Sequence, residues 1–455
     1  MLGGGGDVGS RRVLAGWGGT SPTVATVVPV TAYDAVGRLV AEARGRGVLA
    51  RGLGRSYGDA AQNAGGVVLD MTSRDRVLRV DVEGAEVDVE AGASLDQLMR
   101  LLLPLGLFVP VTPGTRYVTV GGAIAADIHG KNHHVDGSFG QHVTSMDLLV
   151  ADGSIRRLTP NEPLFWATVG GMGLTGVVLR ATLRMTRVES AFCVVDTERC
   201  DDLDDLLARM AEGDDRYTYS VAWIDCLARG SSLGRSVLTR GWSARRDQLP
   251  ARLRSRATEF RPHQLAVAPS VFPSGLLNRT TVTAFNEAWF RRAPRERRGE
   301  VQGIATFFHP LDGIGQWNRV YGPRGFLQYQ FVVPFGAEGT LRRCLEMLAE
   351  SGQASFLAVL KRFGAVGDGH LSFPSPGWTL ALDLPVGAVT LGGLLDRLDA
   401  EVLAAGGRFY LAKDSRLPAS AMAQMYPRLD EWRAVRAEAD PRGVFTSDLA
   451  RRLDL

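Results

Sequence analysis

The chain has 455 residues, of which 45% are hydrophobic and 22% are charged, and its net charge is +3. This composition is typical of a folded protein, and the length favours two or three domains. So small a net charge gives no reason to expect a nucleic-acid partner. No stretch contains the roughly 18 apolar residues that a transmembrane helix needs. We expect no signal peptide, because the first residues lack a continuous apolar core.

The first residues are glycine-rich, from Gly3 to Gly9. No strand precedes this run, so it lacks the context of a dinucleotide-binding fingerprint, and we expect a flexible terminus. A helix is predicted next, over residues 32–44, because Val36 and Val40 share a face with other apolar side chains.

Two glycine-rich loops follow. The first, RGLGRSYG, occupies residues 51–58; the second lies within Pro113–His134, where Val118–Val120 precede Gly121–Gly122. Glycines let backbone N–H groups approach an anion without a Cβ in the way, and successive free amides form an anion-binding concavity. The pair predicts a long anionic cofactor held between the loops, with His129 at the end of the second.

Short strands and helices alternate around these loops. Ser94 and Gln97 have the spacing of a capping box before a predicted helix at residues 95–103. Strands are predicted at residues 67–70, 77–81, 86–90, 146–150 and 177–183. The alternation indicates an α+β fold.

Arginines become frequent after about Val188. Residues 240–298 contain thirteen arginines, no lysine and four acidic residues, a local charge of +9, so the rest of the chain sums to −6. The segment is either a solvated surface or a lid that touches an anionic, lipid-bearing surface, where each basic residue contributes about 1 kcal/mol. A lid would also explain a long loop in a compact enzyme.

Three buried strands are predicted further along, at residues 325–334, 356–363 and 377–385. Side chains alternate between the faces of a strand. The side chains that share a face within each strand are Gln328 with Gln330, Lys361 with Phe363, and Thr379 with Ala381 and Asp383. If the strands are neighbours, one sheet face packs on a core and the other forms a cavity floor. A helix at residues 391–404 would cover the apolar face.

The four cysteines show no C-x-x-C spacing, so we expect neither a disulfide framework nor a metal site. Several histidines lie near one another from His129 to His142. No cysteine or carboxylate stands at the usual zinc-ligand spacing from them, and we expect no metal there.

The two glycine-rich loops resemble those of the PCMH-type FAD-binding domain of the vanillyl-alcohol oxidase superfamily. The first is similar to the pyrophosphate loop of that family, and the second to its T-x-GG-x-x-A…HG segment. Members that attach FAD covalently commonly have a histidine at the fifth position of the first loop, where this chain has Arg55. The resemblance therefore implies non-covalent FAD.

The motifs HGKNHH, GFLQYQF, PGWTLALDLP, YLAKDSR and MYPRLDEW extend the resemblance over nearly the whole chain. They are similar to those of the decaprenylphosphoryl-β-D-ribose 2-oxidases, the flavoprotein half of a bacterial 2′-epimerase. This resemblance implies FAD-dependent oxidation of the ribose 2-hydroxyl of a polyprenyl-phosphate sugar to a keto intermediate. A separate NAD(P)H-dependent short-chain reductase would complete epimerisation to the arabinose donor for cell-wall arabinan.

The resemblance also implies a two-domain fold. We expect an FAD-binding PCMH-type domain at residues 1–190 and a substrate-binding domain at residues 191–406, built on an antiparallel sheet covered by helices. An arginine-rich flexible lid would lie near residues 240–300. Residues 407–455 would return to the FAD domain and bring Tyr410 and Lys413 to the cofactor. Family members imply a peripheral position at the cytoplasmic membrane, on the periplasmic side, with contact to anionic lipid.

The positions that match the family motifs give a candidate site. The expected FAD-binding residues are Arg51, Gly52, Leu53, Gly54, Arg55, Ser56, Tyr57, Gly58, Asp59, Gly114, Thr119, Val120, Gly121, Gly122, Ala126, Asp127, Ile128, His129, Val177 and Tyr410. The expected substrate-binding residues are Lys131, Gln328, Gln330, Lys361, Phe363, Thr379 and Ala381. The expected catalytic residues are Lys413 and His129.

Lys413 and His129 compete for the role of the base that takes the hydroxyl proton. A lysine desolvated beside another cation has a lowered pKa. Lys361 and Lys131 would suit contacts with phosphate or sugar as compact donors. Taken alone, His129 is more often a structural hydrogen-bonding residue, and Lys413 a surface lysine. Mycobacterial members have a cysteine at the position of Ala381 that nitroaromatic inhibitors attack, and alanine cannot form that adduct.

Two other functions stay open. One is an FAD-dependent oxidase of a soluble sugar, alditol or aldonolactone, against which the arginine-rich segment argues. The other is a flavin-free binding protein that keeps the fold.

Overall fold

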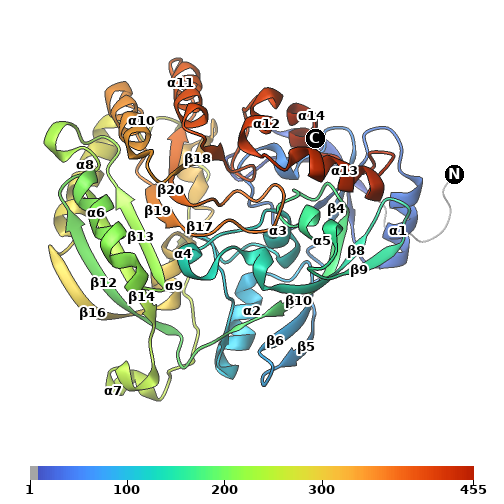
Figure 1. The fold of residues 1–455 in the computed structure, drawn as a ribbon, viewed down its shortest axis with the longest axis horizontal. Helices are drawn as coiled ribbons and strands as arrows, with labels where there is room; N and C mark the ends of the chain where they lie inside the picture. Colours follow the sequence, from blue (N-terminus) through green and yellow to red (C-terminus); the bar gives the residue numbers. More distant parts are fainter. Residues whose placement is uncertain (1–8) are drawn as a thin grey trace.

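The computed structural model describes residues 9–455 (Figure 1). The stretch Gly3–Gly9, for which we predicted flexibility, lies almost entirely outside the described residues. Helices pack on antiparallel sheets, so the predicted α+β class is confirmed. Within residues 9–455, no helix combines the length and the apolar character that crossing a membrane demands.

A four-stranded sheet carries the first glycine-rich loop. Its order is β1 (Ser10–Leu14), β2 (Thr23–Pro29), β4 (Val67–Asp70) and β3 (Val48–Arg51). Strands β2, β4 and β3 are parallel, and β1 is antiparallel to β2. Helix α1 (Tyr33–Glu42) buries Val36 and Val40 against this sheet. Because β3 ends at Arg51, the loop that follows lies at the carboxyl edge of the parallel strands.

A five-stranded antiparallel sheet lies beside the first. Its order is β5 (Val77–Asp81), β6 (Glu86–Glu90), β10 (Val177–Arg184), β8 (Val143–Leu149) and β9 (Ile155–Leu158). Helix α2 (Leu95–Leu102) begins with the predicted capping box, since Ser94 accepts from the N–H of Gln97 and the Gln97 side chain accepts from the N–H of Ser94. A short pair, β7 (Leu107–Phe108) with β11 (Thr186–Arg187), leads into the next sheet.

The largest sheet has eight antiparallel strands. Its order is β16 (Glu296–Gly303), β12 (Phe192–Cys200), β14 (Ser236–Ser243), β13 (Tyr219–Ile224), β19 (Ala358–Phe363), β20 (Gly377–Pro385), β18 (Phe326–Pro334) and β21 (Arg408–Phe409). The three strands predicted to be neighbours are adjacent, as β19, β20 and β18.

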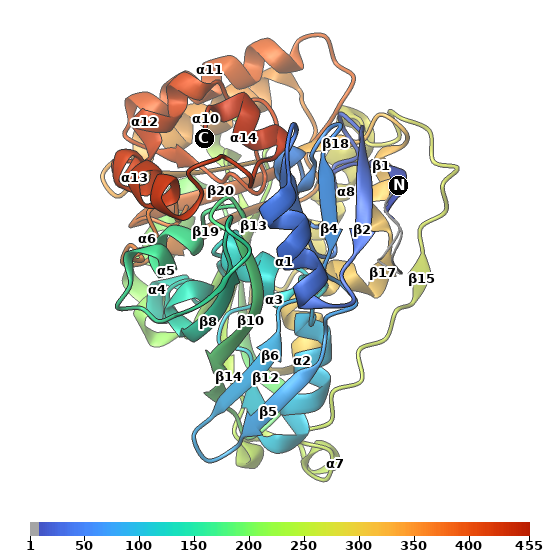
Figure 2. The same cartoon turned by 90° about the vertical axis from the view of Figure 1, so that its right-hand side faces the viewer.

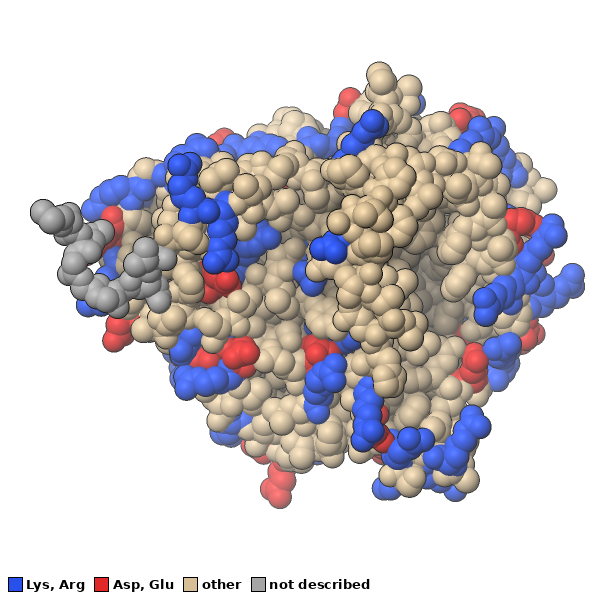
Figure 3. All heavy atoms as spheres, turned by 180° about the vertical axis from the view of Figure 1, so that it is seen from behind, with Lys and Arg blue, Asp and Glu red and all other residues tan. Residues whose placement is uncertain are grey.

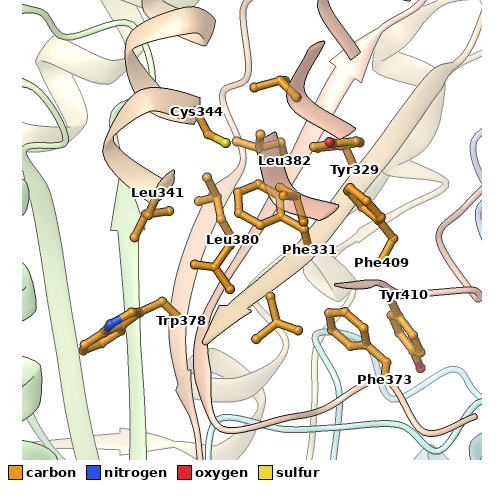
Figure 4. Close-up of a cluster of buried hydrophobic side chains, with 14 of the residues drawn as sticks. Tyr329, Phe331, Leu341, Cys344, Phe373, Trp378, Leu380, Leu382, Phe409 and Tyr410 are labelled. Atoms are coloured by element: carbon orange, nitrogen blue, oxygen red, sulfur yellow. The ribbon is translucent and has the colours of Figure 1, made fainter. Parts of the chain in front are cut away.

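Helices cover one face of this sheet. They are α6 (Leu203–Gly213), α10 (Glu338–Ser351) and α11 (Leu391–Ala404). Figure 4 shows Leu341 and Cys344 of α10 directed toward Phe331 and Leu380 of the sheet. This apolar face is closed to solvent, so the opposite face, which carries Gln328 and Lys361, is left for a cavity.

Six further helices precede the C-terminal segment in the described structure. They are α3 (Val120–Ala125), α4 (His133–Asp136), α5 (Pro163–Thr168), α7 (Ala251–Arg254), α8 (Arg279–Arg292) and α9 (Ile304–Phe308).

The C-terminal segment returns to the first sheet, and two of its helices pack against α5 and against residues 59–61 (Figure 1). These helices are α12 (Met422–Met425), α13 (Leu429–Ala439) and α14 (Asp448–Leu453). The N–H of Val48 donates to the carbonyl of Val444 at 2.8 Å, and the N–H of Thr446 donates to the carbonyl of Val48 at 3.1 Å. The returning chain therefore extends the edge of the sheet at β3.

The arginine-rich segment is divided among several elements. Arg240 lies in β14, is 3% exposed and forms an ion pair with Glu198 at 2.9 Å, so the solvated-surface interpretation was wrong for this residue. Between α7 and α8 the chain is extended along one side of the molecule (Figure 2). In the described structure this stretch contains the short strand β15 (Ala266–Val267), which pairs with β17 (Ile314–Gly315).

Candidate functional site

A cavity of about 710 Å³ lies where the first loop, the region of α3 and the open face of the eight-stranded sheet meet. A volume in this range is typical of small-molecule and cofactor sites. The expected site residues that line it are Arg51, Gly52, Leu53, Gly54, Arg55, Ser56, Tyr57, Gly114, Thr119, Gly121, Gly122, Ala126, Ile128, His129, Lys131, Gln328, Lys361, Ala381, Tyr410 and Lys413. Segments from both ends and the middle of the chain thus meet in one place.

The first loop presents free backbone donors to this cavity. Within the described residues, the N–H groups of residues 52–55 donate to no protein acceptor. The Arg51 guanidinium fixes the start of the loop by donating to the carbonyls of Ala15 and Ala61. Gly54 has φ +63°, a conformation that favours glycine. Consecutive free amides at the edge of a cavity suit an anion.

The second loop differs from the prediction. Its glycine pair lies in helix α3, which Thr119 caps by accepting from the N–H of Gly122 at 3.2 Å. The N–H of Gly121 donates to the carbonyl of Ala91 at 2.8 Å, and that of Val120 to Ala93 at 2.8 Å. The expected free amides are therefore absent at residues 120–122, because close packing of the helix start uses them. Gly52 packs on the same helix cap: a Cβ there would lie 2.2 Å from Oγ1 of Thr119.

Five of the expected cofactor residues lie outside the cavity wall. Gly58 packs against the backbone of Asp414, and Asp59 forms an ion pair with Arg452 of α14 at 2.8 Å. Val120 and Val177 are fully buried in hydrophobic clusters. Asp127 accepts from the hydroxyls of Ser138 and Ser372 and from the N–H of Gly140, and so connects three segments beneath the site.

Three of the expected substrate residues also lie behind the wall, where they surround His129. The ring of Phe363 lies 4.9 Å from that of His129. The side-chain nitrogen of Gln330 lies 3.0 Å from Nε2 of His129 and 3.0 Å from Oγ1 of Thr379. These residues hold the histidine and do not face the cavity.

The hydrogen bonds fix the form of His129. The hydroxyl of Thr379 donates to the carbonyl of Phe331 at 2.8 Å, so it must accept from the Gln330 amide. The second amide hydrogen of Gln330 then points to Nε2 of His129, and the proton of the ring is on Nδ1. The pKa of His129 is held well below its usual value by burial and by the charges of Lys361 and Lys413. His129 is therefore neutral, and its one lone pair is occupied.

Three lysines meet at the cavity from separate elements. Burial, and then the charge of Lys361, lowers the pKa of Lys131 to about 7. Burial lowers the pKa of Lys361 to about 8. The pKa of Lys413 is lowered by burial and by Lys361, and Asp383 opposes this shift. An anionic ligand would stabilise their charged forms. A neutral Lys413 has a free lone pair, so it is the candidate proton acceptor.

Several lining residues were missed by the sequence analysis. The backbone N–H of Trp17 donates to the carbonyl of Ser56 at 2.8 Å, and the guanidinium of Arg55 lies 4.1 Å from the centre of the Trp17 ring. Asp312 and Trp317 reach the cavity from the segment after α9. Gln264 and Val267 reach it from the extended stretch between α7 and α8. No local motif marks these residues, because only the tertiary fold brings them to the loop.

The site fits a flavin dinucleotide. The free amides of residues 52–55 would hold its phosphates, and the cavity is large enough for a cofactor and a sugar ring at its floor. Tyr410 and His129 would lie at the reactive end. FAD, when bound, supplies an acceptor for a hydride.

Comparisons with known proteins agree with this reading. A family model described as "FAD binding domain" matches residues 24–159. A second, described as "D-arabinono-1,4-lactone oxidase", matches residues 395–453. Delta(24)-sterol reductase of Homo sapiens is 34% identical over 111 residues, 24% of this chain and 22% of that protein. The fold and the site thus define an FAD-dependent oxidoreductase, and the predicted cofactor is confirmed.

Longer matches identify the family. Decaprenylphosphoryl-beta-D-ribose oxidase of Mycolicibacterium smegmatis is 51% identical over 453 residues, 98% of each chain. An uncharacterised protein of Streptomyces coelicolor, from the mprA 5′ region, is 45% identical over 369 residues, 80% of this chain and all of that protein. The chain belongs to the decaprenylphosphoryl-β-D-ribose oxidase family, as its motifs predicted.

Proposed function

We propose that this protein catalyses the FAD-dependent oxidation of the ribose 2-hydroxyl of decaprenylphosphoryl-β-D-ribose to the 2-keto sugar. The observation that carries the proposal is the meeting of Lys131, Lys361 and Lys413 at the floor of one cavity that also has the amide-lined loop. A phosphate ester and a sugar hydroxyl need cationic donors and a proton acceptor, and these residues supply both.

The residues divide the work by their protonation. Lys413 in its neutral form accepts the hydroxyl proton as the hydride leaves the adjacent carbon. Lys361, whose pKa is lowered only to about 8, and Lys131, whose Nζ donates to the carbonyl of Phe307, hold the phosphate and the sugar oxygens. Ala381 leaves room for the sugar ring at the floor of the cavity. His129 is a structural residue of the cavity wall and takes no proton, because its Nε2 already accepts from the amide of Gln330.

The proposal is tested by an anaerobic absorbance scan of the FAD-loaded protein mixed with a polyprenyl-phosphoryl ribose. We expect loss of the oxidised flavin band, as two-electron reduction requires. A Lys413→Met variant should bind FAD but reduce it at least about a hundredfold more slowly, the loss typical for a positioned base.

A second candidate substrate class is an aldonolactone, because a D-arabinono-1,4-lactone oxidase model matches residues 395–453. The same scan with D-arabinono-1,4-lactone and with free ribose tests it. Bleaching by the lactone but not by the lipid-linked sugar would overturn the proposal in favour of this one.

We further propose that the protein lies on the surface of an anionic membrane. The stretch between α7 and α8 borders the cavity and exposes apolar side chains: Leu265 is 85%, Val271 80% and Val267 56% exposed. Arginines lie at its start, among them Arg261, whose side chain is 77% exposed. Figure 3 shows this face with a broad uncharged band and basic and acidic side chains around it; the basic ones are arginines, because the three lysines of the chain line the cavity. Such a surface suits a lipid headgroup layer beside the polyprenyl chain.

Sedimentation with vesicles tests this surface. We expect binding to vesicles that contain phosphatidylglycerol, and weaker binding to pure phosphatidylcholine or at high salt. A Leu265→Ser/Val271→Ser double variant should lose most of the binding and retain FAD. Ile155→Ser is the control, because Ile155 is 49% exposed but lies in β9, at the edge of the five-stranded sheet. Equal binding by the double variant would contradict the proposed surface.

The keto product of this reaction requires a second enzyme. We propose an NAD(P)H-dependent short-chain reductase as the partner that completes epimerisation, with the product used for cell-wall arabinan on the periplasmic side of the membrane. Mixing this protein, its substrate, NADH and such a reductase should yield the arabinose epimer, detected by chromatography of the released sugar.

A further inference from the structure

Asp383 is a buried carboxylate behind the cavity wall. It faces Gln328 across the β18–β20 pair, and Nε2 of Gln328 donates to its Oδ1 at 2.6 Å. The hydroxyl of Tyr321 lies 3.3 Å from its Oδ2. Asp383 is fully buried, and neither of these partners carries a charge. Such a group needs a countercharge nearby to stay ionised.

A continuous wall connects Asp383 with Lys413. The ring of Tyr321 stacks on Phe326 at 4.1 Å, and Tyr57 meets the same Phe326 ring edge-on at 5.6 Å. Nζ of Lys413 lies 5.7 Å from the centre of the Tyr57 ring. Gln328, which binds Asp383, also lines the cavity beside Lys413. Gln328 and these aromatic rings therefore connect the buried carboxylate to the amine at the cavity.

Asp383 and Lys413 each favour the charged form of the other. The pKa of Asp383 is raised by burial, and the charge of Lys413 opposes the shift. The pKa of Lys413 is lowered by burial and by Lys361, and the charge of Asp383 opposes that shift. Tyr57, Tyr321 and His129 are neutral here, because burial raises the pKa of the two tyrosines and lowers that of the histidine. The other charged groups are Lys361, beside Lys413, and Arg55 and Asp312, near Tyr57.

We propose that Asp383 is a positioning residue for the oxidation, one that shares a single proton with Lys413 and keeps its amine basic enough to act. The inference rests on the proposed function. When the hydride leaves the ribose carbon with two electrons for bound FAD, the hydroxyl proton passes to Nζ of Lys413 and the C=O bond forms. The new ammonium group then faces a carboxylate as well as the like charge of Lys361. Without Asp383 the amine would be a weaker base.

The first test is the pH dependence of anaerobic flavin reduction in an Asp383→Asn variant. Neutral Lys413 is the active form, so the rate rises with pH through the pKa of this residue. Loss of the carboxylate lowers that pKa, and we expect the midpoint to move to lower pH by about one unit, the lower end of the effect of an opposite charge. The plateau rate should fall, and the KM should be unchanged.

Asp399→Asn is the matched control. Asp399 is also a buried carboxylate that accepts from a tyrosine, Tyr329, at 2.8 Å, but its cation is Arg416 and not Lys413. This variant should keep the wild-type midpoint. If Asp383→Asn does not fold, Gln328→Leu is used instead, because loss of the amide donor favours protonated Asp383 and shifts the midpoint in the same direction.

A second readout needs no substrate. Acetic anhydride modifies only neutral amines, so the extent of Lys413 acetylation against pH, measured by mass spectrometry, reports its protonation in the FAD-loaded protein. An acid shift in Asp383→Asn but not in Asp399→Asn supports the proposal, and equal midpoints in all three proteins overturn it. The two experiments can also disagree. If the labelling midpoint shifts in Asp383→Asn but no polyprenyl-linked sugar reduces the flavin of the wild type, the proposed function is rejected and the effect of Asp383 on Lys413 is supported.

Discussion

The side-chain nitrogen of Gln330 lies 3.0 Å from Nε2 of His129, and this one contact decides which residue can act as the base. The hydroxyl of Thr379 donates to the carbonyl of Phe331, so it accepts from the side-chain amide of Gln330. The other hydrogen of that amide points to Nε2 of His129, which places the proton of the ring on Nδ1. A histidine held in this way has no free lone pair for a substrate proton.

We therefore expect His129 to remain neutral and protonated on Nδ1 from about pH 6 to 8, the range in which an ordinary histidine changes charge. Nitrogen-15 NMR of histidine-labelled protein distinguishes the two ring nitrogens and would show it. In Gln330→Leu, Nε2 loses its donor and the two tautomers should mix. A doubly protonated ring at about pH 6 would contradict the assignment.

The second prediction concerns the contact between the two loops. A Cβ at Gly52 would lie 2.2 Å from Oγ1 of Thr119, the cap of α3, whereas a Cβ at Gly114 would have no protein atom within 4 Å. Gly52→Ala must displace either the loop or the cap. We expect its affinity for FAD to fall by at least about tenfold, or 1.4 kcal/mol, as measured by fluorescence titration.

Gly392→Ala is the comparison for this experiment, because a Cβ at Gly392 in α11 would also meet no atom within 4 Å, and this residue lies away from the cavity that Gly114 lines. It should bind FAD nearly as well as the wild type. Equal losses in the two variants would mean that the Thr119 contact is not the reason for the glycine at position 52.

Local patterns were enough to predict many elements. The bounds of β4, β5, β6, β20 and α11 agree with those predicted, because alternation or helical spacing is strong there and the caps are local. The start of α3 was misread. The β-branched residues before Gly121 favour an extended chain, but the Thr119 cap and the bonds to Ala91 and Ala93 impose a helix.

The site was harder to predict than the fold. Motifs marked Lys131, Lys361 and Lys413 separately, but their meeting depends on the register of β18, β19 and β20 and on the return of the C-terminal segment. Asp59 lies just beyond the loop that faces the cavity, and its ion pair with Arg452 directs its side chain away from the cavity. A sequence motif does not contain that information, since the partner is distant in the chain.

The third prediction concerns a buried ion-pair network beside the cavity. Arg116 is 1% exposed and binds Asp312 at 3.2 Å and Asp96 at 2.6 Å. Removal of the guanidinium leaves Asp312 without its cation and Asp96 with only the exposed Arg100. Arg116→Met should therefore lower the free energy of unfolding by about 3–5 kcal/mol, measured by urea denaturation of the FAD-free protein.

Two further variants make this prediction specific. Arg116→Met/Asp312→Asn should recover part of the loss, because one uncompensated charge is removed. Arg100→Met removes only the exposed partner of Asp96 and should cost less than about 1 kcal/mol. A single variant at Arg116 as stable as the wild type would show that the network contributes little.

The last prediction concerns Ala381. The four cysteines of the chain are free and buried, and burial raises the pKa of Cys193 to about 12, so thiol reagents should not modify the folded wild-type protein. Ala381 lines the cavity beside Lys361 and Lys413, whose charges favour a thiolate. Ala381→Cys should therefore gain one adduct with iodoacetamide, seen as a single mass shift.

Ala358→Cys, on the face of β19 packed against the helices, should gain none. FAD that covers position 381 would slow the reaction in the loaded protein, whereas an adduct on the folded wild type would contradict the burial of its thiols.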